Sequence, residues 1–372
     1  MMVLLNGFVG TALAPSQSLA TLAMGTMVAG TALCTIPAAR LAAKKGRRLG
    51  FILGAGLCFV GALLSAFAIW IESFFLFCAT SMLFGGTMAF LLQMRFAAAE
   101  SVRLDKVSLA VSMILFAGIG AAFIGPRVGV WASGWIESVP YVGAFLALAA
   151  LALIAGVILA FYQDQARPQQ QEQRVRLPLR ALCTGRFLLG VRCGVTSFGV
   201  MALIMTATPI SMHNHQGISL EDTSLVIQLH IVAMFLPSLF TGYLIQRLGV
   251  QWVALAGLLC NFVCVYFALS GMSFTYYLTA LVFLGLGWNG LFMAGTQMIA
   301  TSHTGPERFQ AQAINDFVVF GIQGVASLSA GLLLAWVGWQ GLNFIGFSLL
   351  MICLAGWFHL VFIKQTFAVG SA

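Results

Sequence analysis

Long apolar runs alternate with short polar segments along almost the whole chain. A helix that crosses a membrane needs about 20 mostly apolar residues, and eleven runs meet this length. They cover residues 18–39, 49–70, 74–98, 107–131, 140–162, 187–211, 223–245, 251–270, 276–300, 309–337 and 340–363. None shows the alternation of a β-barrel strand. The pattern therefore predicts an all-α membrane protein.

Another apolar run precedes these eleven at the N-terminus, but it is too short to be counted because it ends at Pro15. The 14 residues before that proline would cover only about 21 Å of a helix at 1.5 Å per residue. We expect them to form the second half of a first helix that lacks most of its length. A cleaved signal peptide is the alternative, although no basic residues precede the run.

The composition agrees with membrane insertion. Of the 372 residues, 60% are hydrophobic and 8% are charged, which is too little charge for the surface of a soluble protein of this size. The net charge of +8 resides in short loops and does not indicate a nucleic-acid partner. Most of the eight cysteines lie in apolar runs, where Cys packs as a small hydrophobe, so we expect neither a metal site nor a cofactor.

The basic residues also predict the orientation of the chain. With the 40–48 loop in the cytoplasm, all 18 Lys and Arg residues except Arg127 and Arg192 fall on the cytoplasmic side. The two exceptions lie within predicted spans, and the opposite loops contain no basic residue. Such asymmetry is typical of inner-membrane proteins and places the C-terminus in the cytoplasm.

The two halves of the chain repeat each other at an offset of about 200 residues. Gly46 and Gly249 end similar loops, and the pairs Asp105–Lys106 and Glu307–Arg308 each open a helix. Such an offset across six helices indicates a duplicated bundle. Four regions follow from it: an N-terminal bundle with an incomplete first helix (1–162), a Gln- and Arg-rich cytoplasmic linker (163–186), a C-terminal bundle (187–364) and a cytoplasmic tail (365–372).

The loop after the second helix, "ARLAAKKGRR", resembles the signature G-x-L-x-D-R-x-G-R-R of the Major Facilitator Superfamily. The matching positions are Leu41, Gly46, Arg47 and Arg48. Ala39 and Ala43 replace the first glycine and the acid, which puts the acid's role in locking the two halves in doubt. The second copy keeps Gly242, Leu244, Arg247 and Gly249, and in the fifth helix Gly125, Pro126 and Gly129 resemble the family's antiporter signature G-P-x-x-G.

The resemblance implies a monomeric transporter that moves a small organic solute by alternating access. Helices 1, 4, 7 and 10 would line a central cavity with the solute near the midplane. The stretches "RFAAAE" and "QAINDFVVFG" also resemble a bacterial branch with members linked to vitamin or siderophore-type solutes. The partners expected are the solute, membrane lipid and, in one alternative, protons.

Asp316 is the residue that the apolar pattern explains least. It follows Arg308 by eight residues and so lies about 12 Å into its helix, where a charged Asp costs about 2.5–3.5 kcal/mol. Its counterparts in the first half are Met113 and Ile114, so it is no shared structural acid. It is a protonation site coupled to transport or a carboxylate bonded to a neighbouring helix or to Arg192.

Other polar residues within the spans are candidates for the same chemistry. For Arg192 there are three alternatives: binding of an anionic solute, pairing with Asp316, or extension of the side chain to the lipid headgroups. For His230 the alternatives are a proton relay and packing through a hydrogen bond. The solute-binding candidates are Trp288, Asn289, Thr296, Gln297, Gln312 and Asn315, for which helix packing is the alternative. Arg95 and Arg127 are predicted to anchor helix ends at the interfaces.

The leading hypothesis is a secondary transporter. No G-x-x-x-x-G-K motif is present, so ATP drive within this chain is not expected. The first alternative is a transport-inactive relic, because a missing half-helix would open the cavity wall. The second is a membrane-embedded enzyme with Asp316 and His230 as acid and base, which their different depths disfavour.

Overall fold

The computed structural model describes residues 2–15, 19, 22–164, 182–304 and 307–363. Helices dominate these ranges, which contain no β-strand, so the all-α prediction is confirmed there. Most of the predicted linker 163–186 and the whole tail 365–372 lie outside the described residues.

The helices follow the apolar runs. Before the linker they are α1 (Met2–Leu13), α2 (Leu22–Lys45), α3 (Arg47–Trp70), α4 (Phe74–Leu91), α5 (Met94–Glu100), the 3₁₀-helix η2 (Leu104–Lys106), α6 (Val107–Ser133) and α7 (Val142–Ala160). After it come α9 (Gly185–Pro209), the π-helical η3 (Ile210–His215), α10 (Leu220–Phe235), α11 (Ser238–Leu248), α12 (Val250–Ser270), α13 (Phe274–Ala300), α14 (Glu307–Phe358) and the π-helical η4 (His359–Ile363).

Nine helical segments within the described ranges are long and apolar enough to cross a membrane. The last of them, Glu307–Phe362, contains the predicted spans 309–337 and 340–363. These two spans meet at Gly338, whose φ of 69° and ψ of −178° interrupt the helix. Eleven complete crossings after a shortened first helix therefore stay a prediction.

The chain groups into two compact units. The first comprises Met1–Ala97, Gly120–Arg174 and Gln312–Phe317, and the second comprises Ala98–Ile119, Val175–Ala311 and Val318–Ala372. One short segment of α14 thus groups with the first unit, while the rest of that helix groups with the second. The predicted region boundaries at residues 162, 186 and 364 stay a prediction.

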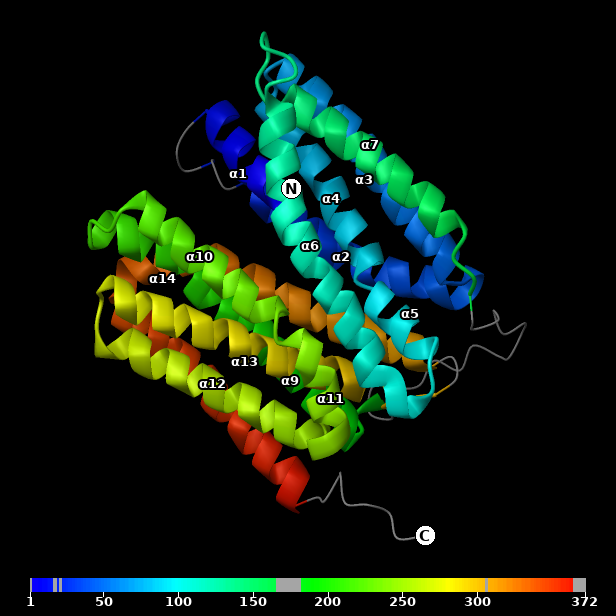
Figure 1. The fold of residues 1–372 in the computed structure, drawn as a ribbon, viewed down its shortest axis with the longest axis vertical. Helices are drawn as coiled ribbons and strands as arrows, with labels where there is room; N and C mark the ends of the chain where they lie inside the picture. Colours follow the sequence, from blue (N-terminus) through cyan, green and yellow to red (C-terminus); the bar gives the residue numbers. More distant parts are fainter. Residues whose placement is uncertain (1, 16–18, 20–21, 165–181, 305–306, 364–372) are drawn as a thin grey trace. The chain divides into compact units, whose positions relative to one another are not determined.

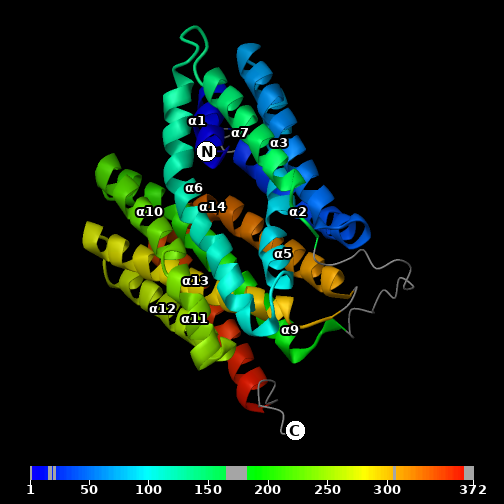
Figure 2. The same ribbon diagram turned by 45° about the vertical axis from the view of Figure 1, so that its right-hand side comes forward.

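In the first unit, α2 packs along α4, and α3 packs along α7 (Figures 1 and 2). Phe77, Phe84 and Phe145 are completely buried where α4 and α7 meet. Gly30 and Gly85 let the backbones of α2 and α4 approach, since a Cβ atom on Gly85 would lie 2.6 Å from the amide nitrogen of Thr31. Small residues allow such close packing in membrane bundles.

The second unit uses the same packing device. Helix α13 lies beside α12, α9 and α10, and a Cβ atom on Gly257 of α12 would lie 2.8 Å from the amide nitrogen of Leu291. Buried Asn261 fills the adjoining space and donates from its side chain to the carbonyl of Gly257 at 3.0 Å. Close glycine contacts therefore fix α13 in the centre of this unit.

The two loops that the sequence matched as repeats have the same backbone conformation. Gly46 precedes α3 with φ 83° and ψ 166°, and Gly249 precedes α12 with φ 93° and ψ 148°. A positive φ is favourable for glycine and costly for other residues. The repeated glycines therefore occupy equivalent helix starts, which agrees with a duplicated bundle.

The glycine packing predicts a position-specific loss of stability. We expect Gly85→Ala to lower the free energy of unfolding by about 1–3 kcal/mol, because the added methyl group must displace the α2 backbone. Gly56→Ala is the matched control, since a Cβ atom there meets nothing within 4 Å. Thermal unfolding of both variants in detergent tests the difference, and equal midpoints would contradict the packing role of Gly85.

Candidate functional site

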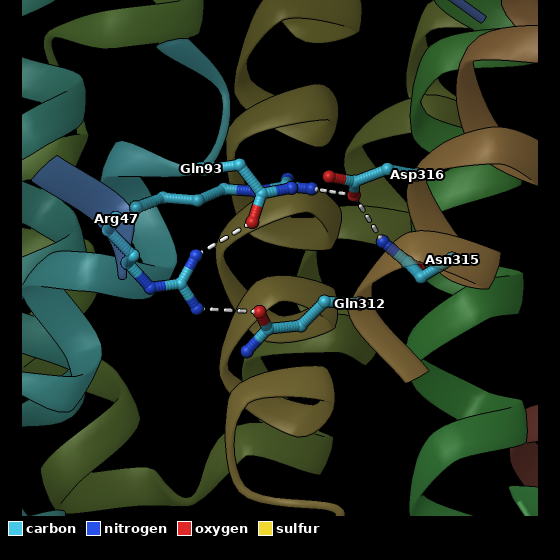
Figure 3. Close-up of polar contacts among 6 residues, drawn as sticks. Arg47, Gln93, Gln312, Asn315 and Asp316 are labelled. Carbon is cyan, nitrogen blue, oxygen red and sulfur yellow. Dashed lines mark hydrogen bonds and ion pairs between the residues drawn. The ribbon is translucent and has the colours of Figure 1, made fainter. Parts of the chain in front are cut away.

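Asp316 lies near the beginning of α14 and is completely buried. Its Oδ1 atom accepts hydrogen bonds from the guanidinium of Arg95 and, at 2.9 Å, from the side-chain amide of Asn315 (Figure 3). Its Oδ2 atom has no hydrogen-bond partner among the described residues. The carboxylate is therefore held by an ion pair and keeps one oxygen unused.

Arg47, the first residue of α3, lies in the same group and is 3% exposed. Its Nη1 atom donates to Oε1 of Gln93 at 2.7 Å, and its Nη2 atom donates to Oε1 of Gln312 at 2.8 Å (Figure 3). Gln312 and Asp316 are four residues apart on α14 and face one way, as their spacing predicts. The buried charge cluster thus consists of Arg47, Gln93, Arg95, Gln312, Asn315 and Asp316.

The charges of this cluster are not balanced. With Asp316 ionised, its carboxylate and the guanidinium groups of Arg47 and Arg95 sum to +1. Removing one partner from a buried ion pair typically costs about 3–5 kcal/mol, because the other charge is left without compensation. Protonation of Asp316 would remove the carboxylate that pairs with Arg95.

Asp164 fixes the helix start that carries Arg47. Its carboxylate follows α7 and accepts from the backbone amide of Arg47 at 2.8 Å and from that of Arg48 at 3.2 Å. An anion at a helix N-terminus satisfies free amides and interacts favourably with the helix dipole. The loop signature lacks its acid at Ala43, and in this structure Asp164 brings a carboxylate to the end of the same loop.

One expectation about the charged residues is wrong: Arg95 is not an interface anchor, because it is 4% exposed and pairs with Asp316. Of the alternatives for Asp316, the contacts agree with a carboxylate bonded to a neighbouring helix and not with a pair to Arg192, which lies beside Gly356 on a later part of α14. The sequence offered two signals: the acid within the span 309–337, and Gln93 and Arg95 near the end of the span 74–98. Whether these residues meet depends on how the helices pack.

Two proposed functional residues have the contacts of packing residues. Both amide hydrogens of Asn289 are used, by the carbonyl of Met234 at 2.8 Å and the hydroxyl of Ser238 at 2.7 Å, and its oxygen accepts from Thr241 at 2.6 Å. These bonds attach the broken helix α10–α11 to α13. His230 is completely buried and hydrogen-bonds the carbonyl of Leu281 through Nδ1 at 2.7 Å. The geometry favours the packing alternative for Asn289, whereas Nε2 of His230 has no hydrogen-bond partner among the described residues.

Trp288 lies at the centre of an aromatic group in the second unit. Its ring stacks on Phe292 at a centroid distance of 4.8 Å and meets the edges of Phe198 at 5.3 Å and Phe235 at 5.7 Å. The ring is 3% exposed, yet its Nε1–H group has no acceptor in the described part of the chain. An unpaired buried N–H costs about 1–3 kcal/mol, so this donor is a candidate for solute contact.

The remaining predicted residues are dispersed. Thr296 is buried, and Gln297 lines a separate cavity near the end of α13. Among the loop residues, Arg48 is exposed. The backbone amide of Gly242 donates to the Ser112 hydroxyl at 3.0 Å. The guanidinium of Arg247 lies 4.7 Å from the centre of the Tyr243 ring. The signature residues Gly125, Pro126 and Gly129 lie within α6.

Comparison with known proteins identifies relatives along the whole chain. The sequence profile described as Major Facilitator Superfamily matches residues 1–201 and 193–369. Riboflavin transporter RfnT of Brucella anthropi is 35% identical over 353 residues, which cover 94% of this chain and 88% of that protein.

Solved structures share the fold at low sequence identity. A bacterial homologue of the iron transporter ferroportin has a TM-score of 0.75 at 13% identity, covering 96% of this chain and 94% of the other. The E. coli fucose:proton symporter FucP has a TM-score of 0.71 at 14% identity with the same coverage.

The buried ion pair predicts non-additive losses of stability. We expect Arg95→Gln and Asp316→Asn each to lower the free energy of unfolding by about 3–5 kcal/mol, because each removes one partner of a buried ion pair. The double variant should lose less than the sum of the two. Arg103→Gln is the control, since its pair with Asp105 is exposed and should contribute less than about 1 kcal/mol. Thermal unfolding in detergent measures all four variants, and strictly additive losses would contradict the coupling.

Proposed function

The chain belongs to the Major Facilitator Superfamily, and we propose that it is a secondary transporter of riboflavin or a closely related flavin. The observation that carries the proposal is the 35% identity to a riboflavin transporter across 94% of the chain. A transporter of a small solute also agrees with the repeated bundle and the buried polar residues. Since its relatives and fold neighbours are transporters, the alternative of a membrane-embedded enzyme is set aside.

The proposed mechanism is alternating access in a bacterial inner membrane, with the C-terminus in the cytoplasm and the protein acting as a monomer. Alternating access moves repeat bundles around a solute site near the midplane. The duplicated loops and the positive charges of the predicted cytoplasmic side support this arrangement. A chain that binds the flavin without moving it would favour the transport-inactive alternative.

Trp288 is the residue we assign to flavin recognition. A flavin is a planar ring system whose edge carries carbonyl groups, so it can stack on aromatic rings and accept a hydrogen bond. Trp288 offers both a stacking face and a buried N–H donor without an acceptor. Aromatic pockets with few polar groups are typical of sites for such ligands. On binding, the flavin ring would replace surrounding phenylalanine rings as the stacking partner of Trp288.

We assign proton coupling to Asp316 in the buried charge cluster. Protonation removes the carboxylate that pairs with Arg95, so it opposes the paired arrangement and favours a state in which that guanidinium reaches water. The ion pair then alternates with a protonated state during transport. His230 is not part of this step, because neither of its ring nitrogens is bonded to a described residue of the buried charge cluster.

Riboflavin transport by the purified protein tests the proposal. We expect proteoliposomes containing the protein to take up radiolabelled riboflavin in a saturable manner, with competition by unlabelled flavin. Trp288→Phe should weaken riboflavin binding about 3- to 10-fold, because one net hydrogen bond of about 0.5–1.5 kcal/mol is lost. Trp336→Phe is the matched control, since Trp336 is 78% exposed. Absence of saturable uptake and of binding would overturn the proposal.

The coupling role predicts separate effects on accumulation and exchange. Under an imposed pH gradient, we expect wild-type proteoliposomes to accumulate riboflavin above its equilibrium level. Asp316→Asn and the Arg95→Gln/Asp316→Asn double variant should lose this accumulation and keep counterflow exchange of riboflavin, because exchange needs solute binding without net proton movement. Arg103→Gln serves as the control. Undiminished pH-driven accumulation by the double variant would rule out Asp316 as the proton site.

A further inference from the structure

A cavity of about 260 Å³ lies within the second unit, at the end of α9 and α13 that we assign to the cytoplasm. Pockets that enclose a whole drug-sized ligand usually measure about 300–1,000 Å³. This cavity is smaller than that range. Its size suits a short polar chain better than a complete flavin.

Two buried acceptor atoms belong to residues that line the cavity. Oε1 of Gln297 and Nε2 of His303 have no hydrogen-bond partner within the described ranges. The hydroxyl of Ser302 donates its single hydrogen to the carbonyl of Ile299 at 2.9 Å. Nδ1 of His303, 2.8 Å from that hydroxyl oxygen, must therefore be the donor of this pair, which leaves Nε2 of a neutral imidazole as an acceptor.

The neutral form of His303 agrees with its surroundings. Burial lowers the pKa of His303, and the carboxylate of Glu307 only partly opposes this effect. The imidazole is therefore uncharged at pH 7, and its free nitrogen requires a donor from a ligand or from water.

Arg186 supplies a donor on the same lining. Its Nη1 atom donates to the hydroxyl of Thr301 at 3.2 Å, and that hydroxyl donates to the backbone carbonyl of Gln297 at 2.8 Å. Arg186 thus lines the same cavity as the two residues that carry these acceptors. Hydroxyl groups both donate and accept, so a chain of neighbouring hydroxyls matches all three side chains.

We propose that this cavity binds the ribityl chain of the flavin, an inference that rests on the proposed function. Riboflavin carries a five-carbon polyol chain on its planar ring, and Gln297, His303 and Arg186 would bind the hydroxyls of that chain. Gln297 follows Trp288 by nine positions on α13, which is about 13.5 Å along the axis. The cavity is therefore a second position for the solute, separate from the aromatic group.

Flavins with and without the polyol distinguish this role. The probes are riboflavin, lumiflavin, which has the ring without the ribityl chain, and ribitol, which has the chain alone. We expect Gln297→Leu and His303→Leu each to weaken riboflavin binding about 3- to 10-fold, as the loss of one hydrogen bond predicts. Lumiflavin affinity should stay unchanged. Competition by ribitol should weaken in the same two variants.

A control substitution and lumiflavin binding distinguish loss of the ribityl site from misfolding and from failure of the proposed function. Gln323→Leu, on α14 and outside the cavity lining, should change neither affinity. Unchanged lumiflavin binding also shows that each variant is folded. Equal losses for both flavins, or no loss for riboflavin, would overturn the ribityl site and indicate that water alone fills the cavity. Failure of the wild-type protein to bind either flavin would instead overturn the proposed function.

Discussion

The ion pair between buried Arg95 and buried Asp316 is the interaction on which the buried charge cluster depends. Two charges this deep are tolerated only while each compensates the other. Gln93 and Gln312 distribute the charge of Arg47 over two amide oxygens without adding an anion. Helix α3 must therefore begin where its first residue reaches α14. Asp164 secures that helix start by accepting from the backbone amides of Arg47 and Arg48.

The same requirement for satisfied polar groups explains the scaffold around the site. Lipid supplies no hydrogen bonds, so polar atoms inside the bundle must find partners in the protein. Asn289 uses every donor to close a break between two helices, and glycines let neighbouring backbones meet. Against this background some buried atoms of the described residues have no partner, among them those of Trp288, Gln297 and His303. A ligand gains at such positions, because its bonds replace none already made.

Local and periodic features were predictable from the sequence, and contacts between distant segments were not. The offset of about 200 residues identified Gly46 and Gly249 as equivalents, and both adopt the same positive-φ helix start. The four-residue spacing placed Gln312 and Asp316 on one face. The partner of Asp316 was missed because Arg95 lies 221 residues away, at the end of an apolar run where an interface anchor was an equally good explanation.

The sequence by itself determined that the chain is helical, apolar enough for a membrane and built from a repeated pattern, because these properties depend on composition and on neighbours along the chain. It also marked Asp316 as a charge in an unfavourable place. Only the tertiary structure decided that Arg95 and Arg47 approach that charge, that Asn289 is fully bonded, and that Trp288 is not. Such outcomes depend on which helix faces pack together, and many packings share one hydropathy pattern.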